Sequence, residues 1–136
     1  MSNQLSKNQR NKVSRRANYR CEYCRLREED TFFTFQVDHI ISQKHGGSNE
    51  LENLAYACPQ CNQHKGTDLA TYLDDQLNLI PFFNPRQQNW FHHFEGVHGE
   101  IIPKSDIGRA TAKILQFNNP ERVIIRGILQ EIGLFP

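Results

Sequence analysis

Hydrophobic and polar positions along the first forty residues predict a basic helix followed by a strand. Residues 5–19 are rich in Lys, Arg, Asn and Gln and contain only a few apolar side chains, which is typical of a mostly exposed helix. The segment Phe32–Ile41 is dense in β-forming residues and predicts one extended strand. The glycines and serine of Lys44–Ser48 are typical of a turn, so we expect the strand to end before them.

The next twenty residues predict a second strand and a short helix. Asn49–Asn53 is predicted as a helical turn capped by the preceding serine, and Leu54–Ala57 as a short strand. Pro59 stands where helices favour proline, at the first position, and Gly66 stands where they favour glycine, just after the end. The sequence therefore predicts a helix from Pro59 to Lys65, in the order strand, loop, strand, helix.

Hydrophobic spacing in the second half predicts a hairpin and two helices that cover a core. The predicted strands of the hairpin are Asn89–Val97 and Glu100–Pro103. Apolar residues recur at helical spacing in two further segments, at Ile107, Ala110, Ile114 and Phe117 and then at Ile124, Ile125, Ile128 and Ile132. Pro120 opens the second of these helices, and Gly133 follows its end. We therefore expect a core over residues 1–68 and an accessory extension over residues 69–136, packed together as one structural unit.

The composition is that of one polar domain. The chain has 136 residues, of which 38% are hydrophobic and 23% are charged, and its mean hydropathy is −0.67. No stretch approaches the roughly 18 consecutive apolar residues of a membrane-spanning helix. The N-terminal residues lack the apolar run of a secretory signal, so we expect a cytosolic protein with no membrane partner.

The charge is distributed unevenly along the chain. The formal net charge is only +1, yet residues 1–27 hold eight Lys or Arg and one Glu, a net +7, while residues 28–136 hold eight Lys or Arg and fourteen Asp or Glu, a net −6. Because affinity for a polyanion follows local positive charge, the basic segment can bind phosphate despite the near-zero total. The alternative is a solvated charged arm without a partner.

Four cysteines form two pairs with the spacing of metal-binding turns. Cys21 and Cys24 make the first Cys-x-x-Cys pair, and Cys58 and Cys61 make the second. Each such turn supplies two thiolates, and four thiolates complete a tetrahedral zinc site with no open position, which predicts a structural Zn²⁺ ion. A thiol redox pair is the alternative, but redox motifs occur singly and beside a βαβ pattern, which this sequence lacks.

A set of short motifs between and around the cysteine pairs carries a family resemblance. The motifs are Val37-Asp-His-Ile-Ile41, Gly46-Gly-Ser-Asn49, Leu51-Glu-Asn-Leu54 and Cys58-Pro-Gln-Cys-Asn62, followed by Lys65-Gly66. In types and spacing these residues resemble an HNH endonuclease of the four-cysteine, zinc-stapled kind found in small bacterial or phage proteins. The resemblance covers roughly residues 20–67. It implies an α+β fold with a ββα-metal motif, preceded by the basic helix and followed by the hairpin and helical extension.

The resemblance also implies a role for each motif residue. His39 is the expected general base that activates water, and Asn53 is expected to brace the loop that carries it. Asp38 and Asn62 are the expected ligands of a catalytic Mg²⁺ or Mn²⁺ ion, since hard cations prefer oxygen. The family name expects a final histidine where Asn62 stands, and His64 is the weaker alternative. Only one of these two side chains faces the metal, because they lie about 200° apart around a helix.

The expected function is therefore the hydrolysis of phosphodiester bonds in nucleic acid. The family favours double-stranded DNA, with 3′-hydroxyl and 5′-phosphate products. We expect phosphate contacts from five basic residues, Arg15, Arg16, Arg20, Lys44 and Lys65. Lys65 has a second interpretation, since a lysine in the last turn of a helix also interacts favourably with the helix end. The alternative function is a zinc-stapled module that binds nucleic acid without cutting it.

Overall fold

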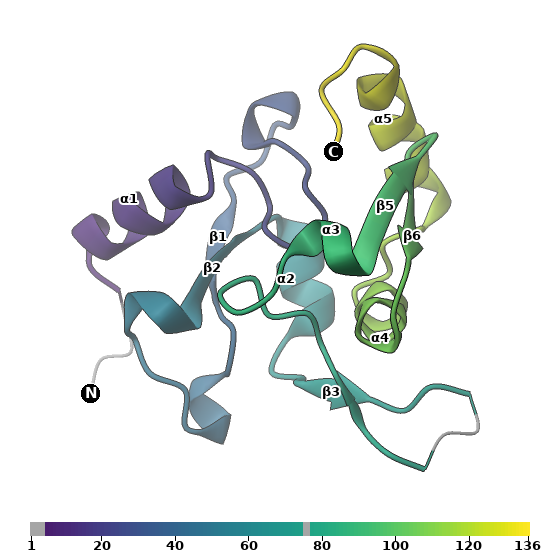
Figure 1. Cartoon of the computed structure of the whole chain (residues 1–136). Coiled ribbons are helices and arrows are strands. Elements are labelled where there is room, and N and C mark those ends of the chain that lie inside the picture. Colours follow the sequence, from purple (N-terminus) through teal and green to yellow (C-terminus); the bar gives the residue numbers. More distant parts are fainter. Residues whose placement is uncertain (1–4, 75–76) are drawn as a thin grey trace.

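A computed structural model describes residues 5–74 and 77–136 of the chain (Figure 1). Its described residues form an α+β fold with five α-helices and three separate two-stranded antiparallel sheets. The helices are α1 (Lys7–Arg16), α2 (Pro59–Lys65), α3 (Trp90–His93), α4 (Asp106–Ile114) and α5 (Pro120–Glu131). The strands are β1 (Gln36–His39), β2 (Leu54–Ala57), β3 (Ala70–Thr71), β4 (Ile80–Pro81), β5 (Phe94–Val97) and β6 (Glu100–Pro103). Short 3₁₀ turns are η1 (Glu28–Asp30), η2 (Gln43–His45) and η3 (Leu51–Asn53).

The unit β1–β2–α2 has the predicted order of strand, loop, strand and helix. β1 pairs with β2 from Gln36 opposite Ala57 to His39 opposite Leu54, and every residue of β2 is buried. The helix α2 follows β2 after one residue, Cys58, whose sulfur accepts the backbone N–H of Cys61. Its bounds are those predicted from the flanking proline and glycine. This unit fixes His39, at the end of β1, close to α2.

The first strand is shorter than the predicted Phe32–Ile41. Phe32 and Phe33 lie outside the sheet and are exposed. The backbone N–H of Phe35 donates to a carboxylate oxygen of Glu28 at 2.7 Å, and not to a carbonyl oxygen of a neighbouring strand. The β-forming composition was therefore a correct signal for β1 itself, but β2 is only four residues long and pairs only with residues 36–39.

The predicted basic helix is present as α1, which ends earlier than expected. Ser6 and Gln9 form a capping box at its start. Its buried face carries Val13, and the guanidinium of Arg16 donates to the carbonyl oxygens of Leu51 and Leu54 at 2.9 and 2.6 Å. These bonds hold α1 against the loop and strand that follow β1, with its other basic side chains directed outward.

Side chains of the extension contact the first half of the chain directly. Trp90 is buried, and its indole N–H donates to the carbonyl oxygen of Tyr23 at 2.8 Å. Arg86 forms an ion pair with Glu22. The predicted strand over residues 89–97 is wrong in its first half, because the Asn89 side chain accepts the N–H of Phe91 and starts the helical turn α3.

The last helix, α5, faces the opposite way from the prediction. Its four isoleucines were expected in the core, but Ile124, Ile125, Ile128 and Ile132 are 63%, 47%, 59% and 65% exposed. Arg122 and Arg126 are buried in their place. Arg126 donates to the carbonyl oxygens of Gly99 and Phe117 at 2.8 and 2.6 Å, so its buried charge is hydrogen-bonded to backbone.

Among the described helices, none has the length and apolar character needed to cross a membrane.

Candidate metal centre and active site

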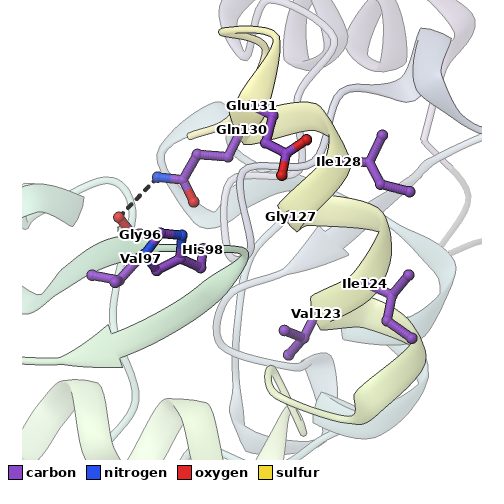
Figure 2. Close-up of a pocket in the computed structure, with 9 residues that line it drawn as sticks. All are labelled: Gly96, Val97, His98, Val123, Ile124, Gly127, Ile128, Gln130 and Glu131. Carbon is purple, nitrogen blue, oxygen red and sulfur yellow. Dashed lines mark hydrogen bonds between the residues drawn. The ribbon is translucent and has the colours of Figure 1, made fainter.

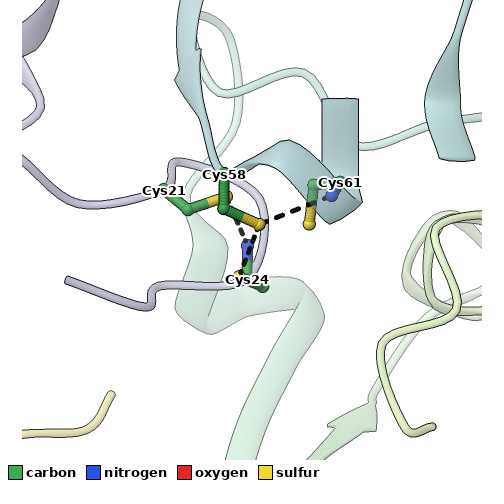
Figure 3. A group of neighbouring side chains, drawn as sticks. All are labelled: Cys21, Cys24, Cys58 and Cys61. Carbon is green, nitrogen blue, oxygen red and sulfur yellow. Dashed lines mark hydrogen bonds between the residues drawn. The ribbon is translucent and has the colours of Figure 1, made fainter. Parts of the chain in front are cut away.

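The four cysteines meet in one buried cluster, as predicted for zinc (Figure 3). Their sulfur atoms all lie within 4.8 Å of one another, and the sulfurs of Cys24 and Cys58 are 3.8 Å apart. A tetrahedral zinc with Zn–S bonds of about 2.3 Å requires sulfur–sulfur edges of about 3.8 Å. The donor set and its size therefore fit a structural Zn²⁺ ion. Such a site joins the turn after α1 to the start of α2.

Backbone N–H groups support the two sulfur pairs. The N–H of Cys24 points to the sulfur of Cys21, and that of Cys61 to the sulfur of Cys58, each at 3.4 Å. In each Cys-x-x-Cys turn, the second cysteine of the pair thus donates to the first. These bonds orient the thiolates before metal binds.

Arg122 is a contact of the cysteine cluster that the motifs did not reveal. Its guanidinium lies 3.0 Å from the sulfur of Cys61 and 3.8 Å from that of Cys58. Burial lowers the pKa of Arg122, but the thiolates of Cys61, Cys24 and Cys58 outweigh burial and raise the pKa overall. Zinc with four thiolates carries two net negative charges, so a buried guanidinium is the complementary partner.

The His39 side chain is bonded to Asn49. Nε2 of His39 lies 2.7 Å from Oδ1 of Asn49, and the same oxygen accepts the amide N–H of Gln43 at 3.0 Å. Because an amide oxygen only accepts hydrogen bonds, Nε2 carries the proton and Nδ1 of the neutral ring is left as the proton acceptor. The sequence motif contained Asn49, but nothing in its spacing indicated this contact.

Asn53 joins two points of the loop that follows β1. Its Oδ1 accepts the N–H of Ile41 at 2.9 Å, and its Nδ2 donates to the carbonyl oxygens of Ile41 and Ser48 at 2.9 and 2.8 Å. The residue is buried at the end of η3. Asn53 therefore joins the two ends of the loop between His39 and Asn49, and its role in bracing His39 stays a prediction.

Asp38 lies on the buried side of β1, with two hydrogen-bond donors at one of its oxygens. Its Oδ2 accepts the hydroxyl of Tyr23 at 2.7 Å and lies 3.1 Å from Nζ of Lys65. Burial raises the pKa of Asp38, while the Lys65 ammonium and the Tyr23 hydroxyl act in the opposite direction. The other oxygen, Oδ1, has only a long contact of 3.4 Å to Lys65.

Lys65 occupies the interior, which corrects its expected contact with phosphate. Only 2% of the residue is exposed. Its ammonium donates to the carbonyl oxygens of His39 and Ile40 at 3.0 and 3.1 Å, in addition to its contact with Asp38. A lysine in the last turn of α2 thus reaches the end of β1. It ties together the strand and the helix that carry the expected site residues.

Asp38, His39 and Asn62 line one open pocket of about 430 Å³, together with the exposed Lys44. The Asn62 side-chain N–H donates to Gln36 at 2.6 Å, which leaves its amide oxygen as an available ligand. This oxygen and Oδ1 of Asp38 are the kind of donor that Mg²⁺ and Mn²⁺ prefer, so the pocket fits such an ion. The described lining residues do not include His64.

The basic residues divide into those bound within the fold and those directed to solvent. Arg16 is bonded to backbone carbonyls as described, and Arg20 donates to the carbonyl oxygen of Arg25 at 2.8 Å. Arg15 is exposed, as is Lys44. Three exposed cations of α1 were not among the expected contacts, namely Lys7, Arg10 and Lys12. The basic surface is therefore the outer face of α1 with Lys44.

Comparison with known proteins agrees with this geometry over one segment of the chain. Residues 21–68 match the family model described as HNH endonuclease, and this segment contains β1, β2, α2 and all four cysteines. Neither the curated proteins nor the solved structures include a match to the chain. Residues 21–68, with their ββα unit and a four-cysteine cluster suited to zinc, are therefore similar to the HNH endonuclease family.

Proposed function

We propose that the protein is a metal-dependent endonuclease that hydrolyses phosphodiester bonds in double-stranded DNA. The observation that carries this proposal is the shared pocket lined by Asp38, His39 and Asn62, which brings the expected base and the two residues with oxygen donors together. A scissile phosphate seated there would meet the imidazole and the two oxygen donors together.

His39 is the general base. Asn49 holds the proton on Nε2, so Nδ1 accepts a proton from water as the water attacks phosphorus. The bond between phosphorus and the 3′ oxygen then breaks, and the 3′ oxygen takes up a proton from solvent water, which leaves a 5′-phosphate and a 3′-hydroxyl. The residues that hold Mg²⁺ or Mn²⁺ are Asp38 and Asn62, and the cation when bound neutralises charge on the phosphoryl and leaving oxygens.

The outer face of α1 guides the DNA backbone to this pocket. Lys7, Arg10, Lys12 and Arg15 are exposed on α1. The side chain of Gln9, on the same helix, donates to the carbonyl oxygen of Asn49 at 3.1 Å, so α1 is bonded to the residue that orients His39. Phosphate binding by α1 and positioning of His39 are therefore structurally linked. Lys44, on the pocket wall, is a further phosphate contact.

Residues 69–136 act as an accessory extension that packs on residues 1–68 as one unit. The contacts of Trp90 with Tyr23, of Arg86 with Glu22 and of Arg122 with Cys61 all join the two parts. They bring the extension to the zinc turn and leave the pocket of His39 open. We expect the protein to work in the cytosol, where its thiols stay reduced until they bind zinc.

The second candidate function is a zinc-stapled module that binds nucleic acid without cleavage. The exposed basic face of α1 would serve either function. Binding alone does not require a histidine held in one tautomer in a pocket shared with Asp38 and Asn62, which favours the enzyme.

Incubation of supercoiled plasmid with the zinc-loaded protein tests the proposal. In Mg²⁺ or Mn²⁺ we expect conversion to nicked or linear DNA, and in chelator or with His39→Ala we expect none. A plasmid left equally intact by the native protein and by His39→Ala in either metal would support the binding module instead.

A further inference from the structure

The exposed side of α5 carries a continuous set of apolar side chains, which we call the isoleucine face. It consists of Ile124, Ile125, Ile128 and Ile132, each between 47% and 65% exposed. Beside it, α5 and the β5–β6 hairpin line an open groove of about 680 Å³, with Val97 and His98 on the hairpin side (Figure 2). A contiguous exposed apolar face of this kind is often a functional surface.

The orientation of α5 is fixed from its other side. Arg122 is bonded to the cysteine cluster and Arg126 to the carbonyl oxygens of Gly99 and Phe117. The hairpin turn approaches α5 at Gly99, where any side chain would collide with the backbone of Val123 and Gly127. A rotation of α5 that buried the isoleucines would therefore expose both arginines and break these contacts.

We propose that the isoleucine face is the interface with a second copy of this chain, formed by two α5 helices packed antiparallel about a two-fold axis. Ile124, Ile128 and Ile132 follow one another every four residues, so they form one stripe along the helix. With the axis at Ile128, this residue meets its own copy, and Ile124 of each chain meets Ile132 of the other. The same patch then serves both partners, as a two-fold interface requires.

The charges on α5 favour the antiparallel arrangement. Glu121 and Glu131 are its exposed charged residues, one near each end. Parallel pairing would set each glutamate opposite its own copy. Antiparallel pairing about Ile128 sets Glu131 opposite Ile125 instead, and places Glu121 beyond the last turn of the other helix. Like charges directly opposite each other are thereby avoided.

The apolar area fits a reversible dimer. A fully exposed isoleucine presents roughly 180 Å² of surface, so the four exposed fractions amount to about 400 Å² of apolar surface per chain. Pairing buries about twice this area, and Val97 and the glutamates at the rim add to it. Interfaces at this lower end of the size range are transient, so the dimer should form and dissociate with concentration. The proposal does not depend on cleavage, since it concerns a face remote from the His39 pocket.

Sedimentation equilibrium of the zinc-loaded full chain tests the dimer. We expect the average mass to rise from 15.9 kDa toward twice that value as the concentration increases. Ile128→Glu should keep the monomer mass at every concentration, and Phe32→Glu, at an exposed residue outside the isoleucine face, should behave as the native chain. Bound zinc and circular dichroism report that each variant is folded. A native chain that stays monomeric, or a dimer that survives Ile128→Glu or is lost with Phe32→Glu, would overturn the proposal.

Disulfide trapping tests the register. Ile128→Cys should cross-link rapidly to its own copy under mild oxidation, because the two side chains meet at the axis. Ile125→Cys, on the same helix face and facing Glu131 of the other copy, should cross-link much more slowly. Equal cross-linking of the two variants, or faster cross-linking of Ile125→Cys, would contradict the antiparallel register.

Discussion

The Nε2 atom of His39 lies 2.7 Å from the Oδ1 atom of Asn49, so an amide oxygen fixes which nitrogen of the ring is protonated. Asn49 is in turn held by Gln9 of α1 through its backbone carbonyl and by Gln43 through its side chain. The ring therefore presents Nδ1 as its basic atom, with an orientation set by three separate segments of the chain. The proposed base is positioned by residues outside the strand that carries it.

Replacing Asn49 should slow cleavage without removing the base. In Asn49→Ala the tautomer and orientation of His39 are no longer fixed, and we expect kcat to fall by about 10- to 100-fold. Asn49→Asp, which keeps an accepting oxygen, should recover part of the rate. The ¹⁵N chemical shifts of the His39 ring should show the Nε2-protonated form in the native protein and a mixture in Asn49→Ala.

Gln43→Ala provides the matched control, because it removes a neighbour of Asn49 and leaves the acceptor of His39 in place. Its effect on kcat should be much smaller than that of Asn49→Ala. Native kcat and an unchanged ring tautomer in Asn49→Ala would show that this contact does not position the base.

Removal of the Lys65 ammonium should strongly destabilise the fold. Lys65→Met leaves the Asp38 carboxylate buried without its cation, and we expect the free energy of unfolding to fall by about 3–5 kcal/mol. Adding Asp38→Asn to Lys65→Met should recover part of this loss, because no buried charge then remains. Urea unfolding in zinc-containing buffer measures both effects. Lys44→Met, at an exposed lysine, should change stability by less than about 0.5 kcal/mol, and an equal effect of the two lysine variants would contradict the buried pair.

Zinc affinity should depend on Arg122. We expect one zinc ion per purified chain, and Arg122→Gln should retain it about 10- to 100-fold less tightly in competition with a chelator, since the thiolates lose their buried cation. Cys61→Ser should lose most of the metal. Arg109→Gln, at a half-exposed arginine of α4, is the control and should bind zinc as the native chain does. Equal zinc retention by the two arginine variants would exclude a role for Arg122 in the metal site.

DNA binding should weaken steeply with salt despite the net charge of only +1. Arg10→Gln and Arg15→Gln should each reduce the slope of log K against log salt by about 1, because each removes one phosphate contact. Lys104→Gln, at an exposed lysine after β6, should leave the slope unchanged. Fluorescence anisotropy with a labelled duplex measures the slope, and a Lys104→Gln effect as large as that of Arg10→Gln would argue against α1 as the binding surface.

Local signals made much of the first half predictable. Pro59 begins α2 and Gly66 follows its end, because the backbone preferences of proline and glycine act within one turn of a helix. The two Cys-x-x-Cys pairs predicted the cysteine cluster because each turn brings two sulfurs together before any long-range contact forms. The order of strand, loop, strand and helix was also predicted from local signals, and it brings Asp38, His39 and Asn62 to one pocket, where their roles stay a prediction.

Long-range contacts explain what the sequence did not reveal. The spacing of the α5 isoleucines correctly indicated an apolar face. Which face of α5 is buried, however, depends on contacts with distant segments. Arg122 contacts the cysteine cluster and Arg126 contacts the hairpin turn, so the face that carries the arginines is the buried one. Lys65 was expected to contact phosphate, yet its ammonium lies in the interior beside Asp38 and the carbonyl oxygens of His39 and Ile40. No local pattern indicates partners that lie 25 to 64 residues away along the chain.

The most direct measurement of the central claim compares binding and cleavage of one labelled DNA duplex by the native protein and by His39→Ala. We predict that His39→Ala binds the duplex with nearly native affinity in Mg²⁺ or Mn²⁺, while its single-turnover cleavage rate falls at least about 100-fold. Cleavage by His39→Ala at the native rate, with zinc content and affinity unchanged, would contradict the assignment of His39 as the base that activates water.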